Sequence, residues 1–323
     1  MQMMANMVNA INGALETSMK ENENVVLLGE DIGRDGGVFR VTEGLLDKFG
    51  EKRVIDTPLA ESGIAGTAIG MALAGLHPIP EMQFAGFMFL AFSQLINHAS
   101  RYRSRTRSAL KVPMVVRTPV SGGVRTLEHH SESPEAYYSH MGGLIVVEPS
   151  TPYDAKGLMI KAARMEDPVI FLEPTKLYRL FKQEVPDEPY EIEIGKAREV
   201  SSGDKLSIIT YGTMVPLVSE VVKKRGISAD IIDLRTINPL DEKAIIDSAK
   251  KTGRVLIVHE ASLSFGVGAE VAARVAEKAI YELQAPVIRV ASNSFPYPFP
   301  GYEKYYIPNE LKVSKAIDRL LNS

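Results

Sequence analysis

The sequence contains no cysteine. The chain therefore has no disulfide framework, no thiol nucleophile and no thiolate zinc site. The absence of cysteine fits a reducing compartment. Residues 1–10 also lack the basic start and the apolar run of a signal peptide, so we expect a cytoplasmic protein.

Long apolar runs and a strong net charge are missing as well. The most apolar stretch, residues 64–76, is about half as long as a membrane-spanning helix requires, so no membrane span is expected. The formal net charge is −3, which gives no electrostatic reason to expect binding to nucleic acid or to an acidic membrane. The 323 residues are enough for two domains rather than one.

Helix and strand patterns alternate along the chain, as they do in parallel α/β folds. The expected strands lie at 25–28, 77–83, 113–117, 144–147, 168–172, 206–211, 229–234, 254–259 and 286–290. The expected helices lie at 3–19, 63–74, 87–105, 153–165, 215–225, 241–251, 266–283 and 308–321. Between the two series, an acidic segment with two prolines has no periodicity. We therefore predict a domain at 1–183 with a parallel sheet, a linker at 184–194 and a second α/β domain at 195–323.

Glu61 stands at the start of a predicted helix that is rich in small residues. An acid at this place favourably faces the helix dipole, which is a common structural role. However, Leu59 and Ile64 beside it are apolar, and Gly66 and Gly70 recur at a spacing that lets two helices approach closely. Because a carboxylate in apolar surroundings either costs stability or does chemistry, we expect Glu61 to be catalytic and to lie near a buried seam.

The extended segment 81–87 carries Gln83 and Phe87. Pro78 and Pro80 exclude a helix interior just before it, so the segment is expected to reach the C-terminal end of a strand. Ligands bind at such strand ends in α/β folds, and an aromatic ring there can stack on a flat heterocycle. The bland alternative is that the phenylalanines of this region belong to the core.

A loop with two adjacent histidines, His129 and His130, follows the flexible segment 121–123. Histidines near Glu128 and Ser131 can bind a metal ion or transfer protons. Adjacent side chains point apart in most conformations, so a metal clamp is not expected. One catalytic histidine with a supporting neighbour is the favoured functional interpretation, and an ordinary surface loop is an equal alternative.

Two further patterns carry weaker signals. The glycine-rich segment 29–37 resembles a loop that cradles phosphate, but it lacks the Lys-Ser/Thr pair of a P-loop. Arginines recur at alternate positions over 101–107. Such a cluster is usually a solvated face; the alternative is a surface at a subunit contact that faces carboxylate or phosphate.

Many ordered islands of this sequence resemble the beta subunits of the thiamine-diphosphate-dependent 2-oxo acid dehydrogenases, in the decarboxylating component. The resemblance runs nearly end to end. The islands lie at 29–32, 36–40, 56–61, 81–85, 130–136, 154–158, 232–237, 259–261 and 306–308. In residues 130–135 and around Tyr102 and Arg103, the chain is most similar to the branched-chain type of this family. The pyruvate type is related.

The resemblance implies a transketolase-like fold, with an N-terminal pyrimidine-binding domain and a C-terminal transketolase-type domain. It also implies an α2β2 heterotetramer with thiamine diphosphate between alpha and beta subunits, a beta–beta contact, and docking to a lipoyl acyltransferase core. The alpha subunit of this family holds magnesium and diphosphate through a Gly-Asp-Gly motif. This chain has no such motif, so we expect it to hold the cofactor poorly alone. Some relatives hold a potassium ion, but Met165 stands where a carboxylate is expected, so no metal site is predicted on this chain.

The resemblance also implies roles for single residues. Glu61 matches the glutamate that bonds the aminopyrimidine ring nitrogen, where a shared proton favours the imino tautomer. Phe87 matches the aromatic residue that stacks on that ring, and Leu59 and Gln83 match neighbours in the same pocket. His130 matches the histidine that faces the reacting carbon and donates a proton during acyl transfer to lipoamide.

The expected function is therefore that of a lipoamide-dependent 2-oxo acid dehydrogenase beta subunit, active only with its alpha subunit. The branched-chain 2-oxo acids are the favoured substrates. The alternatives are a pyruvate or acetoin dehydrogenase beta subunit and a non-catalytic assembly module.

Overall fold

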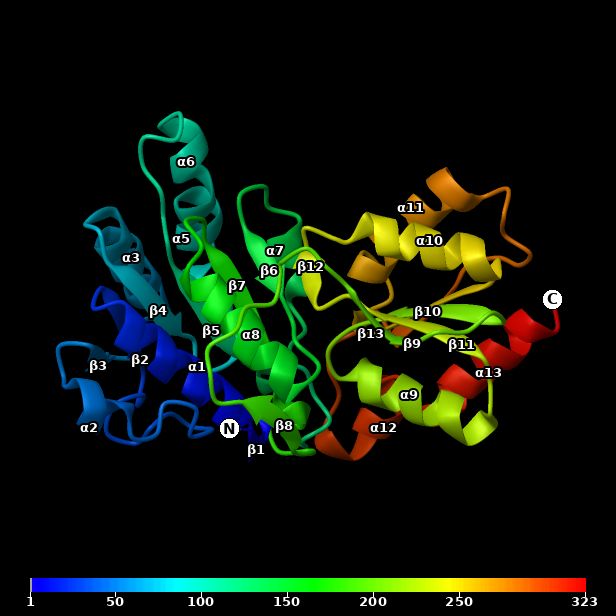
Figure 1. The fold of residues 1–323 in the computed structure, drawn as a ribbon, viewed down its shortest axis with the longest axis horizontal. Helices are drawn as coiled ribbons and strands as arrows, with labels where there is room; N and C mark the ends of the chain where they lie inside the picture. Colours follow the sequence, from blue (N-terminus) through cyan, green and yellow to red (C-terminus); the bar gives the residue numbers. More distant parts are fainter. Residues whose placement is uncertain (1) are drawn as a thin grey trace. The chain divides into compact units, whose positions relative to one another are not determined.

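Short runs of apolar residues form the central strands of the chain (Figure 1). The computed structural model describes residues 2–323, and these fall into two units. The first unit runs up to Val120 and resumes at Tyr137–Ile194; the second comprises Ser121–Ala136 and Gly195–Ser323. The segment with the two adjacent histidines is therefore counted with the second unit.

The first unit is built on a parallel sheet with the strand order β6-β7-β5-β4-β2-β3. Its strands are β2 (Val25–Gly29), β3 (Val54–Asp56), β4 (His77–Glu81), β5 (Val115–Val120), β6 (Ile145–Val147) and β7 (Val169–Pro174). Strands β2, β5 and β7 are buried at every position, as expected for a parallel sheet covered on both faces. A separate antiparallel pair joins β1 (Gln2–Ala5) to β8 (Gln183–Pro186), at the start of the predicted linker.

The helices of the first unit are mostly short. They are α1 (Met7–Glu21), α2 (Leu45–Phe49), α3 (Glu61–Leu73), α4 (Ala85–Met88), α5 (Phe92–Asn97), α6 (Tyr102–Arg105), α8 (Pro152–Ala163) and the 3₁₀ turns η1 (Phe89–Ala91), η2 (Ala99–Arg101) and η4 (Thr175–Leu177). α7 (Glu135–Ser139) continues from the second unit into the first. α1 and α8 begin at side-chain caps: Asn6 accepts from the Asn9 amide, and Thr151 from the Asp154 amide.

The single helix expected over 87–105 is wrong. The segment consists of α4, α5 and α6 separated by 3₁₀ turns. His98 has φ −118° and ψ −72°, in the right-handed helical region but far from ideal α-helical values, and Ser100 Oγ donates back to the Ile96 carbonyl at 2.8 Å. Such back-bonding by serine bends helices, which the apolar periodicity of the segment does not reveal.

The second unit has a sheet with the strand order β14-β13-β10-β11-β9, parallel except for the edge strand β9. Its strands are β9 (Arg198–Ser201), β10 (Leu206–Thr210), β11 (Ala229–Asp233), β13 (Val255–Ser262) and β14 (Ile288–Ser292), with a short β12 (Thr236–Asn238). Its helices are α9 (Met214–Arg225), α10 (Glu242–Thr252), α11 (Val267–Ala279), α12 (Glu303–Tyr306), α13 (Glu310–Leu321), and the 3₁₀ turns η3 (Glu128–His130) and η5 (Pro300–Tyr302). The expected α/β architecture with parallel sheets is confirmed.

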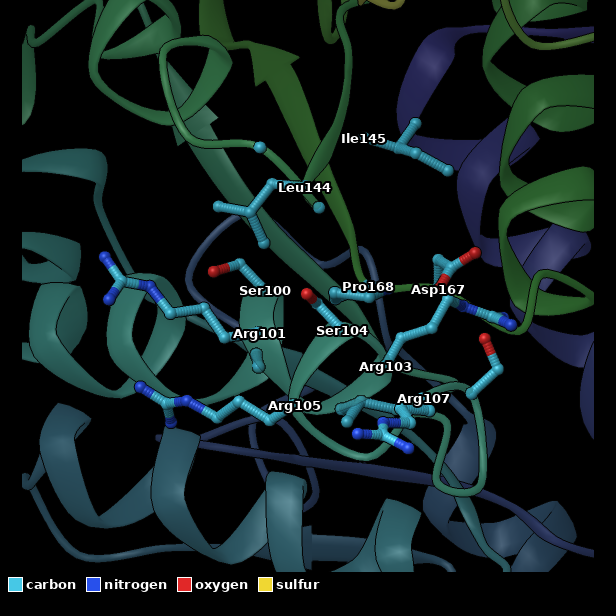
Figure 2. Close-up of a pocket in the computed structure, with 15 residues that line it drawn as sticks. Ser100, Arg101, Arg103, Ser104, Arg105, Arg107, Leu144, Ile145, Asp167 and Pro168 are labelled. Atoms are coloured by element: carbon cyan, nitrogen blue, oxygen red, sulfur yellow. Dashed lines mark hydrogen bonds and ion pairs between the residues drawn. The ribbon is translucent and has the colours of Figure 1, made fainter.

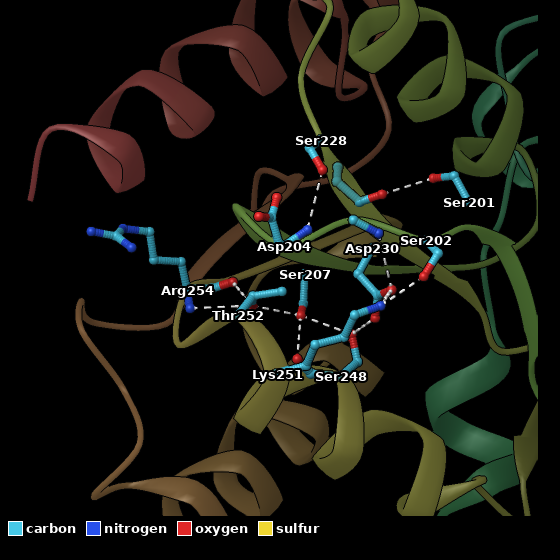
Figure 3. A network of polar contacts seen from close by, with 12 residues as sticks. Ser201, Ser202, Asp204, Ser207, Ser228, Asp230, Ser248, Lys251, Thr252 and Arg254 are labelled. Atoms are coloured by element: carbon cyan, nitrogen blue, oxygen red, sulfur yellow. Dashed lines mark hydrogen bonds and ion pairs between the residues drawn. The ribbon is translucent and has the colours of Figure 1, made fainter.

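A buried polar network ties α10 to β10 and β11 (Figure 3). Asp230 accepts a hydrogen bond from Ser248 at 2.5 Å and from Lys251 Nζ at 2.6 Å. Ser207 donates to the Ser248 carbonyl at 2.7 Å and lies 2.8 Å from the Thr252 hydroxyl. Because each buried polar group here has a partner, the network fixes how the helix lies on the two strands without leaving a charge unpaired.

Candidate functional site

Two acidic side chains are buried at the carboxyl end of β2. Glu61 opens α3 and is only 7% exposed, and Glu30 directly follows β2 and is 4% exposed. Neither carboxylate oxygen of Glu30 has a hydrogen-bond partner among the described residues. Burial raises the pKa of Glu30, and the nearby charges of Glu61 and Asp31 raise it further. Burial and the neighbouring acids therefore make Glu30 easier to protonate than a carboxyl group in water.

Parallel pairing explains why Gln83 lies at the same place. β2 and β4 are in register, with Gly29 opposite Glu81, so the segments that follow the two strands are neighbours. Gln83 Nε2 donates to Asp31 Oδ2 at 3.2 Å. A Cβ on Gly29 would lie 2.9 Å from the Glu81 carbonyl oxygen, so this close approach requires glycine.

The two apolar candidates differ in their surroundings. Phe87, in α4, is partly buried and packs edge-on against Phe84, with ring centroids 5.9 Å apart. Leu59 is 81% exposed, so its side chain contributes nothing to the core of this chain.

His130 lies in the second unit, in η3. Its ring is 4.2 Å from the ring of His129, and the side chain is partly buried. Burial lowers the pKa of His130, and the neighbouring His129 lowers it further, so the imidazole is neutral at pH 7. A neutral imidazole can accept a proton near this pH and, once protonated, can donate it.

The sequence-predicted residues thus fall into two groups. Four of them belong to the first unit: Glu61 opens α3, Leu59 lies just before it, and Gln83 and Phe87 come after β4. His130 belongs to the second unit. Glu30 and Asp31 were not singled out from the sequence. The signal available was an acid pair directly after a continuously apolar strand, at the strand end where α/β folds bind ligands.

A hollow of about 750 Å³ in the first unit contains none of these candidates (Figure 2). It is lined by the four arginines of 101–107, by serines and by Asp167. Arg103 pairs with Asp167 at 2.5 Å, whereas Arg101, Arg105 and Arg107 make no ion pair among the described residues. Figure 2 shows Arg101 and Arg105 pointing to one side, away from Asp167, so the guanidinium groups do not converge on one point.

Two kinds of feature are not found among the described residues. In the part of the chain that the structure describes, no group of three or more histidine or acidic side chains is arranged to hold a metal ion. None of the described helices is both long enough and apolar enough to cross a membrane.

Comparison with protein families assigns both halves of the chain. Residues 3–180 match the transketolase pyrimidine-binding domain, and residues 195–313 match the transketolase C-terminal domain. A solved structure described as a split-gene transketolase, an inactive beta4 tetramer, superposes with a TM-score of 0.79 over 99% of both chains. Its sequence identity is 23%, so this likeness concerns the fold alone.

Similar curated proteins carry the name pyruvate dehydrogenase E1 component subunit beta. The chain is 49% identical to the protein of Acholeplasma laidlawii over 317 residues, 97% of each chain. It is 48% identical to the Bacillus subtilis protein over 98% of each chain, and to the Staphylococcus epidermidis protein over 95%. The pyruvate type of these relatives does not support the branched-chain preference expected from the sequence and favours the pyruvate alternative. The chain belongs to the family of 2-oxo acid dehydrogenase beta subunits, built from a transketolase pyrimidine-binding domain and a transketolase C-terminal domain.

Proposed function

We propose that this chain is the beta subunit of a cytoplasmic pyruvate dehydrogenase, which acts with an alpha subunit on thiamine diphosphate and passes the acyl group to lipoamide. The observation that carries the proposal is the buried pair Glu30 and Glu61, in which burial and a second negative charge favour a held proton. The pyruvate preference is supported by the type of the similar proteins.

The residues at the end of β2 fit the aminopyrimidine part of thiamine diphosphate. The fit rests on the orphaned oxygens of Glu30 beside Glu61, because a carboxyl group that keeps a proton can share it with a ring nitrogen. Phe87 would stack on the flat ring, and Leu59 and Gln83 would line the pocket. When bound, the cofactor supplies a carbon nucleophile and an electron sink for decarboxylation.

Within this scheme, the chain's own residues hold and move protons. Glu61 would bond the ring nitrogen, and Glu30, whose pKa is raised by burial, would hold a proton beside it. His130 would take up a proton and, in its protonated form, donate it during acyl transfer to the lipoyl group; its lowered pKa favours giving that proton up. We also propose that the pyrimidine-binding domain spans residues 1–183, the linker 184–194 and the C-terminal domain 195–323.

The proposed assembly is an α2β2 heterotetramer that docks on a lipoyl acyltransferase core. The alpha subunit would hold magnesium and the diphosphate, because this chain lacks the Gly-Asp-Gly motif. The outward face of α3 supports a beta–beta contact. Gly66 and Gly70 are exposed, and an added Cβ would meet only Gln94, at 4.0 Å, or nothing at all. Packing within this chain therefore does not require glycine at these two positions, whereas close approach of a second helix does.

Reconstitution tests the proposal. The purified chain should not decarboxylate pyruvate, and addition of the alpha subunit, magnesium and thiamine diphosphate should restore turnover. Glu61→Gln should assemble normally but lose about 100- to 10,000-fold in turnover, the usual contribution of a positioned acid–base group. Glu51→Gln, at an exposed position, is the matched control and should behave as the wild type.

Two results would contradict the proposal: turnover by this chain alone, or near-normal turnover by Glu61→Gln. A substrate panel on the complex settles the preference. Branched-chain 2-oxo acids or acetoin turned over faster than pyruvate would remove the pyruvate assignment and leave the shared active site intact.

A further inference from the structure

The loop Ser121–Ala136, called here the histidine loop, has a defined internal structure. The Ser121 amide donates to the Glu132 carbonyl at 2.8 Å, which closes the base of the loop. At its tip, the His130 amide donates to the Leu127 carbonyl at 3.0 Å, and the Ser131 hydroxyl donates to the same carbonyl at 3.1 Å. His130 is therefore fixed relative to the loop, and its position depends on what holds the loop as a whole.

Glu260 of β13 holds the start of the loop. Its two carboxylate oxygens accept from the Gly122 amide at 2.5 Å and from the Thr213 hydroxyl at 2.6 Å, and the residue is only 6% exposed. A Cβ on Gly122 would collide with the Tyr297 hydroxyl, so glycine is needed for this approach. A backbone amide bonded to a buried carboxylate is a strong, charge-assisted contact.

Glu303, at the start of α12, holds the next part of the loop. Its Oε1 accepts from the Arg125 amide at 3.2 Å and from the Tyr297 hydroxyl at 2.8 Å. The Tyr297 oxygen in turn accepts from the Gly123 amide at 3.2 Å. The amides of Gly123 and Arg125 are thus bonded to side chains that lie 174 and 178 residues further along the chain.

Glu135 anchors the end of the loop. It is 1% exposed, and its Oε1 accepts from the Tyr211 hydroxyl at 2.7 Å, while Oε2 has no partner among the described residues. Burial, opposed by the hydrogen bond from Tyr211 and helped by the charge of Glu260, raises the pKa of Glu135 to about 7. Glu135 therefore holds a proton in mildly acidic solution and loses it as the pH rises past neutrality.

We propose that Glu260, Glu303 and Glu135 are positioning residues for His130, which hold the histidine loop on the strand ends of the second unit. The inference rests on the proposed function, because it gives His130 its catalytic role. None of the three glutamates is placed at the cofactor. They act through the backbone and through the orientation of the loop.

The arrangement makes loop stability depend on pH. Ionised Glu135 would place a second buried negative charge near Glu260. The groups around the two carboxyls are the uncharged Tyr211, Thr213, His259, Tyr297 and Tyr306 and the acids Glu132 and Glu303, with Arg289 as the cation that acts on His259. His259 is neutral, because burial lowers its pKa to about 4. The loop should therefore loosen as the pH rises through neutrality.

Hydrogen exchange of peptides covering 122–135 tests the tethers, in the free chain and in the reconstituted complex. Glu260→Gln should lower the protection factor of the loop about 10- to 100-fold, the factor expected for a lost hydrogen bond to a charged group. Thr213→Val, which removes only the second partner of Glu260, should give a smaller loss. Glu277→Gln, at an exposed position of α11, is the control and should change nothing.

Glu135→Gln separates positioning from folding. It cannot ionise, so the wild-type fall in loop protection above pH 7 should be absent in this variant. Unchanged loop protection in Glu260→Gln, or an unchanged pH dependence of loop protection in Glu135→Gln, would contradict the proposal that these glutamates hold the loop.

In the complex, Glu260→Gln should lower kcat for acyl transfer and leave KM for the 2-oxo acid unchanged. A loosened loop with unchanged kcat would overturn the positioning role. Wild-type activity of His130→Ala, by contrast, would count against the proposed role of His130 and leave the tethers standing, because loop protection is measured without turnover.

Discussion

Arg117 is a buried cation whose removal has a calculable cost. It lies in β5, is 1% exposed, and bonds both oxygens of Glu173 in β7, at 2.7 and 2.8 Å. Its remaining guanidinium nitrogen pairs with Glu81 at the end of β4. Tyr178 donates a further hydrogen bond to Glu173 at 2.6 Å. One arginine therefore compensates two buried carboxylates at the strand ends of the first unit.

Arg117→Met keeps much of the side-chain volume and removes the charge. Glu81 and Glu173 are 4% and 0% exposed, so water cannot replace the guanidinium. Removing one partner of a buried ion pair costs about 3–5 kcal/mol, and here two carboxylates lose their partner. We therefore expect the free energy of unfolding of the first unit to fall by at least about 3 kcal/mol at pH 7.

Urea unfolding measures this loss. Far-UV circular dichroism is a suitable signal because the chain has no tryptophan, and hydrogen exchange of β4, β5 and β7 peptides assigns the change to the first unit. The loss should shrink at pH 5, where protonation of the two stranded carboxylates relieves the repulsion. Lys243→Met, which breaks an exposed pair with Asp247, is the control and should have no measurable effect.

Two outcomes would refute the reasoning about Arg117. A loss below about 1 kcal/mol would mean that the carboxylates are not buried as the structure has them. A loss that is equal at pH 5 and pH 7 would mean that lost packing, rather than stranded charge, causes the effect.

Two further predictions concern the second unit. His259 is fully buried, and its pKa is lowered to about 4. Its neutral form therefore contributes about 3 kcal/mol to the free energy of unfolding above pH 6.5, and this contribution is lost as the pH falls toward 4. His259→Leu should remove this part of the pH dependence of urea unfolding. Ser248→Ala removes the 2.5 Å hydrogen bond to Asp230 and should lower the free energy of unfolding by about 1.5–3 kcal/mol, whereas an effect below about 0.5 kcal/mol would show that Lys251 alone satisfies Asp230.

The strands were the most predictable part of the fold. A parallel strand buried on both faces must be apolar at nearly every position, so runs such as 25–28 and 206–210 are visible in the sequence. The short elements were not predictable. β3 has three residues and β8 contains a proline, so neither offers enough periodicity to distinguish a strand from a loop.

The candidate site was predictable where the signal is local. Glu61 is identified by the apolar residues around it, and its burial follows from the helix that it opens. Glu30 could not be identified in this way, because its burial depends on the pairing of β2 with β4, about 50 residues further along the chain. The histidine loop shows the same limit more strongly, since Gly122 and Glu260 are 138 residues apart.

The buried acids of the first unit can now be separated by what neutralises them. Glu81 and Glu173 share Arg117, and an acid that is permanently paired with arginine cannot exchange its proton without breaking a costly contact. Among the described residues, no cation pairs with Glu30 or Glu61, although both are almost as buried. Fold stability alone would favour an arginine beside them as well. The missing cation therefore distinguishes these two acids from those that hold the sheet together, and it supports the proposal that the proton chemistry takes place at the end of β2.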